Sequence, residues 1–325
     1  MRLCWKIWAV AALMIAPVAS QAASCTAQAE LTAQDRNALT AAGGRLVEAV
    51  AQQDLAALQA SLLPAEAAEW EGIRGAAEQA AELVKGGQIQ LRSVYLLDAA
   101  SLTAPADTQF FCSNASGSMT VTITMRALPP GRYAVVLADA AGAPLAGQLG
   151  FILAWDGSAW RLAGLTVRQG AFGGHDGVWY WERARELARS GDPWSAWYCY
   201  EVARFLLVPV DFLSSPNLEK LASEQVQIAG SPLNAFPYSL ADGPRNWKID
   251  AVHVDATLNQ PDLGVVYEST GVTDPAALRT EAVAVLSAFL KVQPGLRTSF
   301  HGLWAYAVKD GKPAPVMELP MAQIP

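Results

Sequence analysis

The segment SMTVTITMRA, residues 118–127, decides the fold class of this chain. Its side chains alternate between apolar and polar: Met119, Val121, Ile123 and Met125 against Thr120, Thr122, Thr124 and Arg126. Because successive side chains of a strand point to opposite faces of a sheet, this period of two predicts a strand. One face of that strand is expected to lie in a core and the other to be polar.

Further strands are predicted on both sides of this segment. Residues 89–97 and 109–113 precede it, and residues 133–137, 148–155 and 160–168 follow it. The turn Asp156-Gly157-Ser158 predicts that the last two strands form a long hairpin.

Three helices are predicted ahead of the strands, over residues 31–50, 54–62 and 65–85. Apolar residues recur at helical spacing in the first, and Pro64 ends the second. Gly86-Gly87 suits a left-handed cap at the end of the third.

Three helices followed by a curved antiparallel meander that ends in AWDGSAWRLAGLTVR, residues 154–168, resemble the cone-shaped fold of the nuclear transport factor two and ketosteroid isomerase superfamily. The resemblance covers residues 31–170 and rests on the order of elements and the terminal hairpin. It implies a cone-like domain over residues 23–172 and a homodimer. Members include isomerases, dehydratases, ligand binders and assembly modules, so the fold leaves the chemistry open.

The next segment, VWYWERARELARSGDPWSAWYCYEVARFLLVP at residues 178–209, predicts two antiparallel helices joined at Gly191-Asp192-Pro193. It is similar to one tetratricopeptide-type hairpin. Such repeats need about three copies to form a stable solenoid, and the sequence shows one. We therefore expect residues 173–230, with a third helix over 217–228, to form a helical bracket against a neighbouring domain.

A small α+β domain is predicted at the C-terminal end, over residues 247–325. Residues 231–246 are rich in Pro, Gly and Asn and predict a linker. Two strands, a helix capped by Asp274 with Pro275 at its first position, and a final hairpin then give the order ββαββ, for which we recognise no family. The predicted fold class of the whole chain is α+β.

Residues 1–22 have the pattern of a secretory signal peptide. Arg2 and Lys6 precede an apolar run over residues 7–19, and small residues follow it. The run of about 13 residues is shorter than the roughly 20 that a membrane-spanning helix needs. We expect cleavage, a periplasmic or secreted protein, and no transmembrane segment in the mature chain.

Three cysteines remain after the leader and Cys4 are removed. In an oxidising compartment this odd number predicts one pair and one spare. Cys199 lies among aromatic residues of a predicted helix and is expected to be a buried small hydrophobe, which leaves Cys25 and Cys112 as the disulfide. In an alternative, the small residues before Cys25 make it the lipid anchor of a lipoprotein, although the usual Leu three positions upstream is missing.

The charge of the chain argues against nucleic acid as a partner. Removal of Arg2 and Lys6 leaves 21 basic against 30 acidic side chains, a net charge near −9. An acidic protein lacks the Lys and Arg that neutralise a phosphate backbone.

Signatures of known catalytic and cofactor sites are absent from the sequence, so we expect no cofactor and no metal. It has no G-x-S-x-G, H-E-x-x-H, C-x-x-C, phosphate-loop or dinucleotide motif. His253 and Asp255 share one strand face, and His301 would have to converge on them to form a two-histidine, one-carboxylate site. We expect strand histidines satisfied by hydrogen bonds instead.

His175 and Asp176 are the weak catalytic candidates, because a histidine beside an acid at a pocket mouth can act as a general base. Residues adjacent in sequence seldom point at one another. The plainer hypothesis makes Asp176 the N-cap of the next helix and His175 a loop residue.

Aromatic residues concentrate between positions 179 and 200, where Trp and Tyr are typical of binding hot spots. The candidates for a binding surface are Trp179, Trp181, Trp194, Trp197 and Tyr198. Packing between domains is the alternative use of the same rings.

The sequence favours a non-catalytic binding or assembly module of the cell envelope that holds an apolar small ligand or a protein partner. One alternative is an isomerase- or hydrolase-type enzyme that uses the cone pocket with His175 and Asp176. Another is a purely structural envelope protein. A polar cluster inside the cone would favour catalysis, and an aliphatic lining would favour binding or structure.

Overall fold

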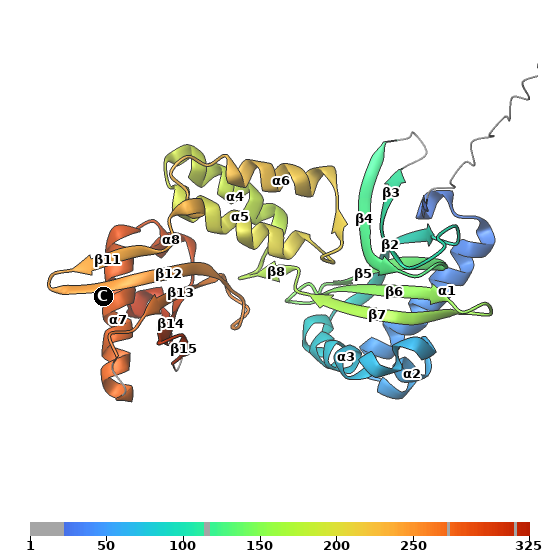
Figure 1. The fold of residues 1–325 in the computed structure, drawn as a ribbon, viewed down its shortest axis with the longest axis horizontal. Coiled ribbons are helices and arrows are strands. Elements are labelled where there is room, and N and C mark those ends of the chain that lie inside the picture. Colours follow the sequence, from blue (N-terminus) through green and yellow to red (C-terminus); the bar gives the residue numbers. More distant parts are fainter. Residues whose placement is uncertain (1–22, 114–117, 272–273, 315–316) are drawn as a thin grey trace, which may run out of the picture.

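The computed structural model describes residues 23–113, 118–271, 274–314 and 317–325 (Figure 1). The predicted signal peptide lies outside the described residues. The fold is α+β, as the sequence predicts, and within the described ranges none of the sheets closes into a barrel.

The N-terminal domain is built on an antiparallel sheet of order β1-β2-β5-β6-β7 with helices on one face (Figure 1). The strands are β1 (Ser24–Ala27), β2 (Gln88–Asp98), β5 (Arg132–Ala141), β6 (Gln148–Trp155) and β7 (Trp160–Arg168). The helices are α1 (Ala33–Ala51), α2 (Leu55–Ala60) and α3 (Trp70–Val84), with short 3₁₀ turns at Gln28–Glu30 and Pro64–Glu69. Aliphatic side chains such as Leu39, Val136 and Leu153 fill the space between helices and sheet.

The strands do not follow one another as a simple meander, contrary to the expectation from the sequence. β2 pairs with β5, while β3 (Ala106–Ser113) and β4 (Met119–Leu128) form a second sheet with β10 (Leu213–Ser214). This sheet packs on the other face of β2 and β5 through Phe110 and Ile123 against Leu97 and Val135. The larger sheet is therefore buried on both faces, which explains the unbroken apolar run at residues 134–138.

The helical bracket consists of α4 (Gly177–Ser190), α5 (Pro193–Leu207) and α6 (Pro216–Val226). A short hairpin of β8 (Ala171–Phe172) and β9 (His175–Asp176) leads into it from the N-terminal domain. Gly191 ends α4 with φ +85°, a left-handed conformation that glycine adopts without strain. The turn predicted at Gly191-Asp192-Pro193 is thus confirmed.

The C-terminal domain has one mixed sheet with helices packed against it. Its strands are β11 (Tyr238–Asp242), β12 (Arg245–Asp255), β13 (Asp262–Glu268), β14 (Gly302–Lys309), β15 (Lys312–Pro313) and β16 (Met317–Pro320). Its helices are α7 (Pro275–Val292) and α8 (Leu296–Ser299), with 3₁₀ turns at Pro232–Asn234 and Met321–Gln323. β13 and β14 are neighbours in the sheet and pair in parallel, and the chain between them contains α7. The stretch 231–246 is not a plain linker, because it contains all of β11 and the start of β12.

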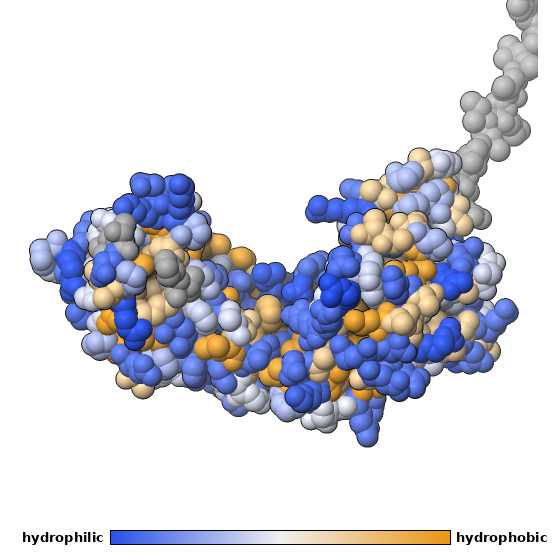
Figure 2. Space-filling model, turned by 90° about the horizontal axis from the view of Figure 1, so that it is seen from below, coloured by the Kyte–Doolittle hydropathy of each residue, from blue (hydrophilic) through white to orange (hydrophobic). Residues whose placement is uncertain are grey.

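The bracket shares a hydrophobic core with the C-terminal domain. Trp194 of α5 packs edge-on against Phe289 of α7 with ring centroids 5.9 Å apart, and Tyr198 packs against Phe300. On its other side the bracket joins the N-terminal domain, because Val210 and Leu213 enter the core beneath β3 and β4. Figure 2 shows the resulting shape, two lobes with a hollow between them.

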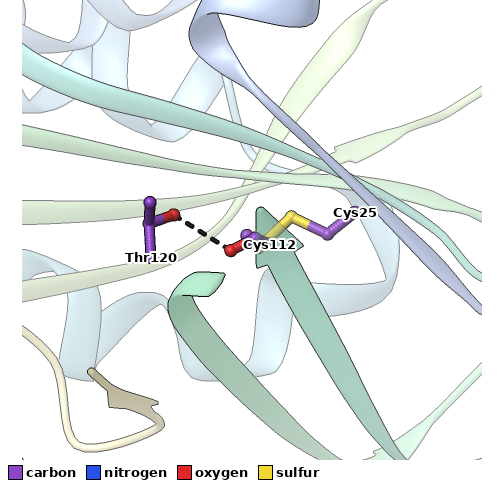
Figure 3. The surroundings of a disulfide bond; sticks show 3 residues. All are labelled: Cys25, Cys112 and Thr120. Carbon is purple, nitrogen blue, oxygen red and sulfur yellow. Dashed lines mark hydrogen bonds between the residues drawn. A yellow bond between two sulfur atoms is a disulfide. The ribbon is translucent and has the colours of Figure 1, made fainter. Parts of the chain in front are cut away.

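Cys25 and Cys112 form a disulfide that ties β1 to β3, which confirms the predicted pair (Figure 3). Thr120 of the neighbouring strand donates a hydrogen bond to the carbonyl oxygen of Cys112 at 2.9 Å. Cys199 is free and buried, as predicted. None of the described helices combines the length and apolarity that a membrane crossing requires.

Candidate functional site

The first turn of α4 holds the two weak catalytic candidates and one of the aromatic ones. Asp176 accepts a hydrogen bond from the main-chain N–H of Trp179 at 2.8 Å and is the N-cap of α4. The imidazole of His175 stacks on the indole of Trp179, with centroids 3.8 Å apart and planes 12° apart. The two side chains contact different groups, so the structure does not bring them together as an acid–base pair.

The five aromatic candidates are not one surface. Trp179 is 40% exposed, whereas Tyr198 is 1% exposed and the prediction that it belongs to a binding surface is wrong. Tyr198 is enclosed because α5 packs against α4 and α6 on one side and the C-terminal domain on the other. Trp181, Trp194 and Trp197 are half-buried against the same core. Trp194 contacts Phe289 of the C-terminal domain, which is the interdomain packing that the sequence offered as the alternative, whereas Trp181 donates to Glu224 within the bracket and lines one of the cavities described below.

Two adjoining cavities of about 330 Å³ each lie where α4 and α5 meet the N-terminal domain. They share Arg92 of β2, Val178 of α4 and Leu207 of α5 in their walls. Val178 is itself exposed, and the exposed Trp179 follows it in the chain but lines neither cavity. A third cavity of about 620 Å³, lined by Arg168, Phe205 and Asp255 among others, lies between the two lobes.

Arg92, which lines both of the smaller cavities, pairs with Asp139 in the wall of one of them. Nη1 of Arg92 lies 3.1 Å from Oδ1 of Asp139, in ion-pair range without the alignment of a hydrogen bond. Burial raises the pKa of Asp139, and Arg92 opposes that rise. Gln148, which is buried, donates from Nε2 to the carbonyl oxygen of Leu206 at 2.6 Å and fixes α5 to the sheet. The walls of these cavities are therefore fixed by contacts of β2 with β5 and of β6 with α5.

The interior of the N-terminal domain provides no counterpart to a catalytic pocket among the described residues. The buried side chains between α1–α3 and the sheet are all apolar.

A group of polar side chains lies at one end of the C-terminal sheet. Asp262 is fully buried, accepts a hydrogen bond from Nε1 of Trp304 at 3.2 Å, and lies 3.0 Å from Nδ1 of His301. Glu318 pairs opposite Trp304 on the next strand. Asp262, His301 and Glu318 offer one ligand atom each within 4.8 Å of one another.

The convergence of His253, Asp255 and His301 considered from the sequence does not occur, because His253 lies against the Tyr306 ring and Asp255 has other hydrogen-bond partners. His301 takes Asp262 as its carboxylate partner, while Asp255 accepts hydrogen bonds from the Tyr306 hydroxyl at 2.5 Å and from the Thr257 amide at 2.9 Å. Burial alone would raise the pKa of Asp255, but these hydrogen bonds outweigh it and lower the pKa. Asp262 was not singled out from the sequence. In the structure Asp262 pairs opposite Asp255 at the β12–β13 turn.

Comparisons with models of protein families, with curated proteins and with solved structures each gave no match. The function of this chain is therefore argued from its own geometry.

Proposed function

We propose that this protein is a non-catalytic binding or assembly module of the cell envelope that docks a partner protein. The docking surface is the bracket rim, defined as His175, Val178 and Trp179 together with the two cavities beside them. One observation carries the proposal: Val178 and Trp179, consecutive large apolar residues, are both exposed, and Val178 lines both cavities. Exposed aromatic anchors beside cavities are typical of protein interfaces.

A protein partner fits the rim better than a small ligand. Each cavity is at the small end of the range for ligand pockets, which is roughly 300–1,000 Å³. Both share Val178 and Leu207 as walls, so an extended segment can place one side chain in each. His175 stacks on Trp179 and restricts the indole, which lowers the entropy cost of binding.

The same proposal includes the family relationships and the location. Helices followed by an antiparallel sheet support a domain like nuclear transport factor two over residues 31–170, and the α4–α5 hairpin supports a tetratricopeptide-like unit. The disulfide fits an oxidising compartment, so we propose a periplasmic or secreted protein. One sulfur atom of Cys25 cannot carry both a disulfide and a lipid, and the intact mass of the mature chain distinguishes the two.

A photo-crosslinking experiment tests the bracket rim. Benzoylphenylalanine in place of Val178 should give a discrete crosslinked partner in the producing cell. Trp179→Ala added to that chain should reduce the adduct at least about tenfold, because loss of an interface Trp costs about 2 kcal/mol or more. The matched control is Trp155→Ala, which removes a Trp of similar exposure, 38%, from the β6–β7 hairpin.

The crosslinking result contradicts the proposal in two ways. No adduct at position 178 would mean that the rim is free in the cell. Equal adduct yields in the Trp179→Ala and Trp155→Ala chains would mean that Trp179 is not an anchor.

A further inference from the structure

We propose that the C-terminal domain binds a divalent transition-metal ion of the Zn²⁺ or Mn²⁺ class through Asp262, His301 and Glu318. None of these residues belongs to the bracket rim, so this proposal stands apart from the proposed function. The ligands come from three strands or strand ends that the sheet brings together: the start of β13, the residue before β14, and β16.

The main chain fixes where these ligands lie. The N–H of His301 donates to the carbonyl oxygen of Pro261 at 3.1 Å, which places His301 beside Asp262. The N–H of Met321 donates to the carbonyl oxygen of His301 at 2.9 Å, which brings the end of β16 alongside. The site is thus built on sheet pairing and not on a loose loop.

The distances suit a metal ion. Nδ1 of His301 and Oδ1 of Asp262 are 3.0 Å apart. That separation matches two neighbouring ligands of an octahedral ion with bonds of about 2.1 Å. The ligand atom of Glu318 lies within 4.8 Å of both, so a rotation of its side chain would let all three ligand atoms bind the same ion.

The chemistry of the site calls for a cation. Two carboxylates lie beside a single imidazole, and Asp262 is fully buried. Oε1 of Glu318 is also buried and has no hydrogen-bond partner among the described residues. Because an unpaired buried oxygen is costly, a bound cation would satisfy the atom that the protein leaves without a partner.

Gly302 keeps the space between the carboxylates open. A Cβ atom at this position would lie 2.7 Å from Oε1 of Glu318 and 3.2 Å from Oδ1 of Asp262. Any larger residue would push the two oxygens away from their common point. The glycine therefore lets both carboxylates reach one ion.

The surroundings indicate the class of ion. Trp304 donates to Oδ2 of Asp262 and leaves Oδ1 directed at His301, which is the outer hydrogen bond typical of metal ligands. Imidazole with carboxylates suits Zn²⁺, Mn²⁺ or Fe²⁺ better than Ca²⁺, which prefers oxygen ligands alone. The His301 side chain is 43% exposed, so the remaining coordination positions face solvent and the ion is exchangeable.

Calorimetric titration of Zn²⁺ into the metal-stripped, untagged mature chain with its disulfide intact tests the proposal. We expect saturable binding of a single ion per chain. Glu318→Gln should weaken binding by at least about 10–100-fold, the loss typical even of an outer-sphere partner, and His301→Ala should weaken it further. His253→Ala is the matched control, because it removes the other histidine of this domain without touching the ligands.

Thermal unfolding with and without Zn²⁺ separates a binding defect from a folding defect. A Glu318→Gln chain that unfolds like the parent without metal, yet gains no stability from Zn²⁺, supports the site. Failure of the parent chain to take up Zn²⁺ or Mn²⁺ saturably overturns it. Binding that survives in both variants overturns it as well.

Discussion

Replacement of Glu224 by Gln will loosen α6 from the rest of the helical bracket by about 1–2 kcal/mol at pH 7. Glu224 is the point where α6 is tied to α4 and α5. Its carboxylate accepts hydrogen bonds from Arg185 Nε at 2.8 Å and Nη2 at 2.9 Å, from Trp181 Nε1 at 2.7 Å and from the Tyr200 hydroxyl at 3.2 Å. Arg185 also lies over the Trp181 ring, 4.3 Å from its centroid.

The magnitude follows from what Gln retains. Its amide oxygen can still accept from Trp181 and Tyr200, but the two charged bonds to Arg185 are lost. A hydrogen bond to a charged group contributes about 1.5–3 kcal/mol when buried. Because the Arg185 and Glu224 side chains are 32% and 25% exposed, solvent screening reduces each bond to about 0.5–1 kcal/mol.

The effect depends on pH with a defined sign. Hydrogen bonds from Arg185 are the main cause of a lowered pKa for Glu224 in the folded chain. A carboxyl whose pKa is lowered in the folded chain contributes its full stabilisation of the folded state above its unfolded pKa, about 4.5. That stabilisation is lost as the pH falls through the folded pKa. Gln resembles the protonated acid, so the difference in stability between parent and variant should shrink as the pH falls below 4.5 and through the folded pKa.

Hydrogen exchange of the α6 peptides measures this difference, because 1.4 kcal/mol corresponds to about a tenfold faster exchange. Peptides of β5 in the same sample provide an internal standard. Glu186→Gln is the matched control, since Glu186 pairs with Arg183 at 3.3 Å on the exposed face of α4 and should contribute under about 0.5 kcal/mol. An effect of Glu224→Gln that does not decrease as the pH is lowered from 7 into the acid unfolding range, or an equally large effect of Glu186→Gln, would refute the reasoning.

Two further predictions concern packing. Cys199 should resist iodoacetamide in the native chain and react after denaturation, as intact mass will show, because burial raises the pKa of its thiol to about 12. Gly177→Ala should destabilise the chain by about 1–3 kcal/mol in urea unfolding, because the new Cβ would lie 2.6 Å from Cγ of Leu207. Gly44→Ala, where nothing lies within 4 Å of the new Cβ, should instead be neutral or stabilise by up to about 1 kcal/mol.

Local features of the fold were predictable because they depend on residues near one another in sequence. The alternation at 118–127 predicted β4, and Asp176 and Asp274 cap α4 and α7 as expected. The stretch 231–246 was misjudged locally, because its Pro, Gly and Asn residues concealed β11. Gly243, with φ +63°, makes the turn of its hairpin and is not a sign of a loose linker.

Features that depend on distant pairing could not be predicted in this way. β2 pairs with β5, and the β3–β4 hairpin between them in sequence belongs to a different sheet. The periodicity of side chains does not indicate which strands pair. Asp262 and His301 meet because β13 and β14 pair in parallel across α7. Tyr198 was placed on a surface because helical spacing shows which residues share a face but not how many faces are covered.

The helical bracket is part of two hydrophobic cores, one shared with each lobe. Neither lobe can swing on a hinge without opening apolar packing to water. The bracket therefore holds the two lobes at one separation. A partner long enough to touch both lobes meets them already at their final separation, and no part of its binding free energy is spent on freezing domain motion.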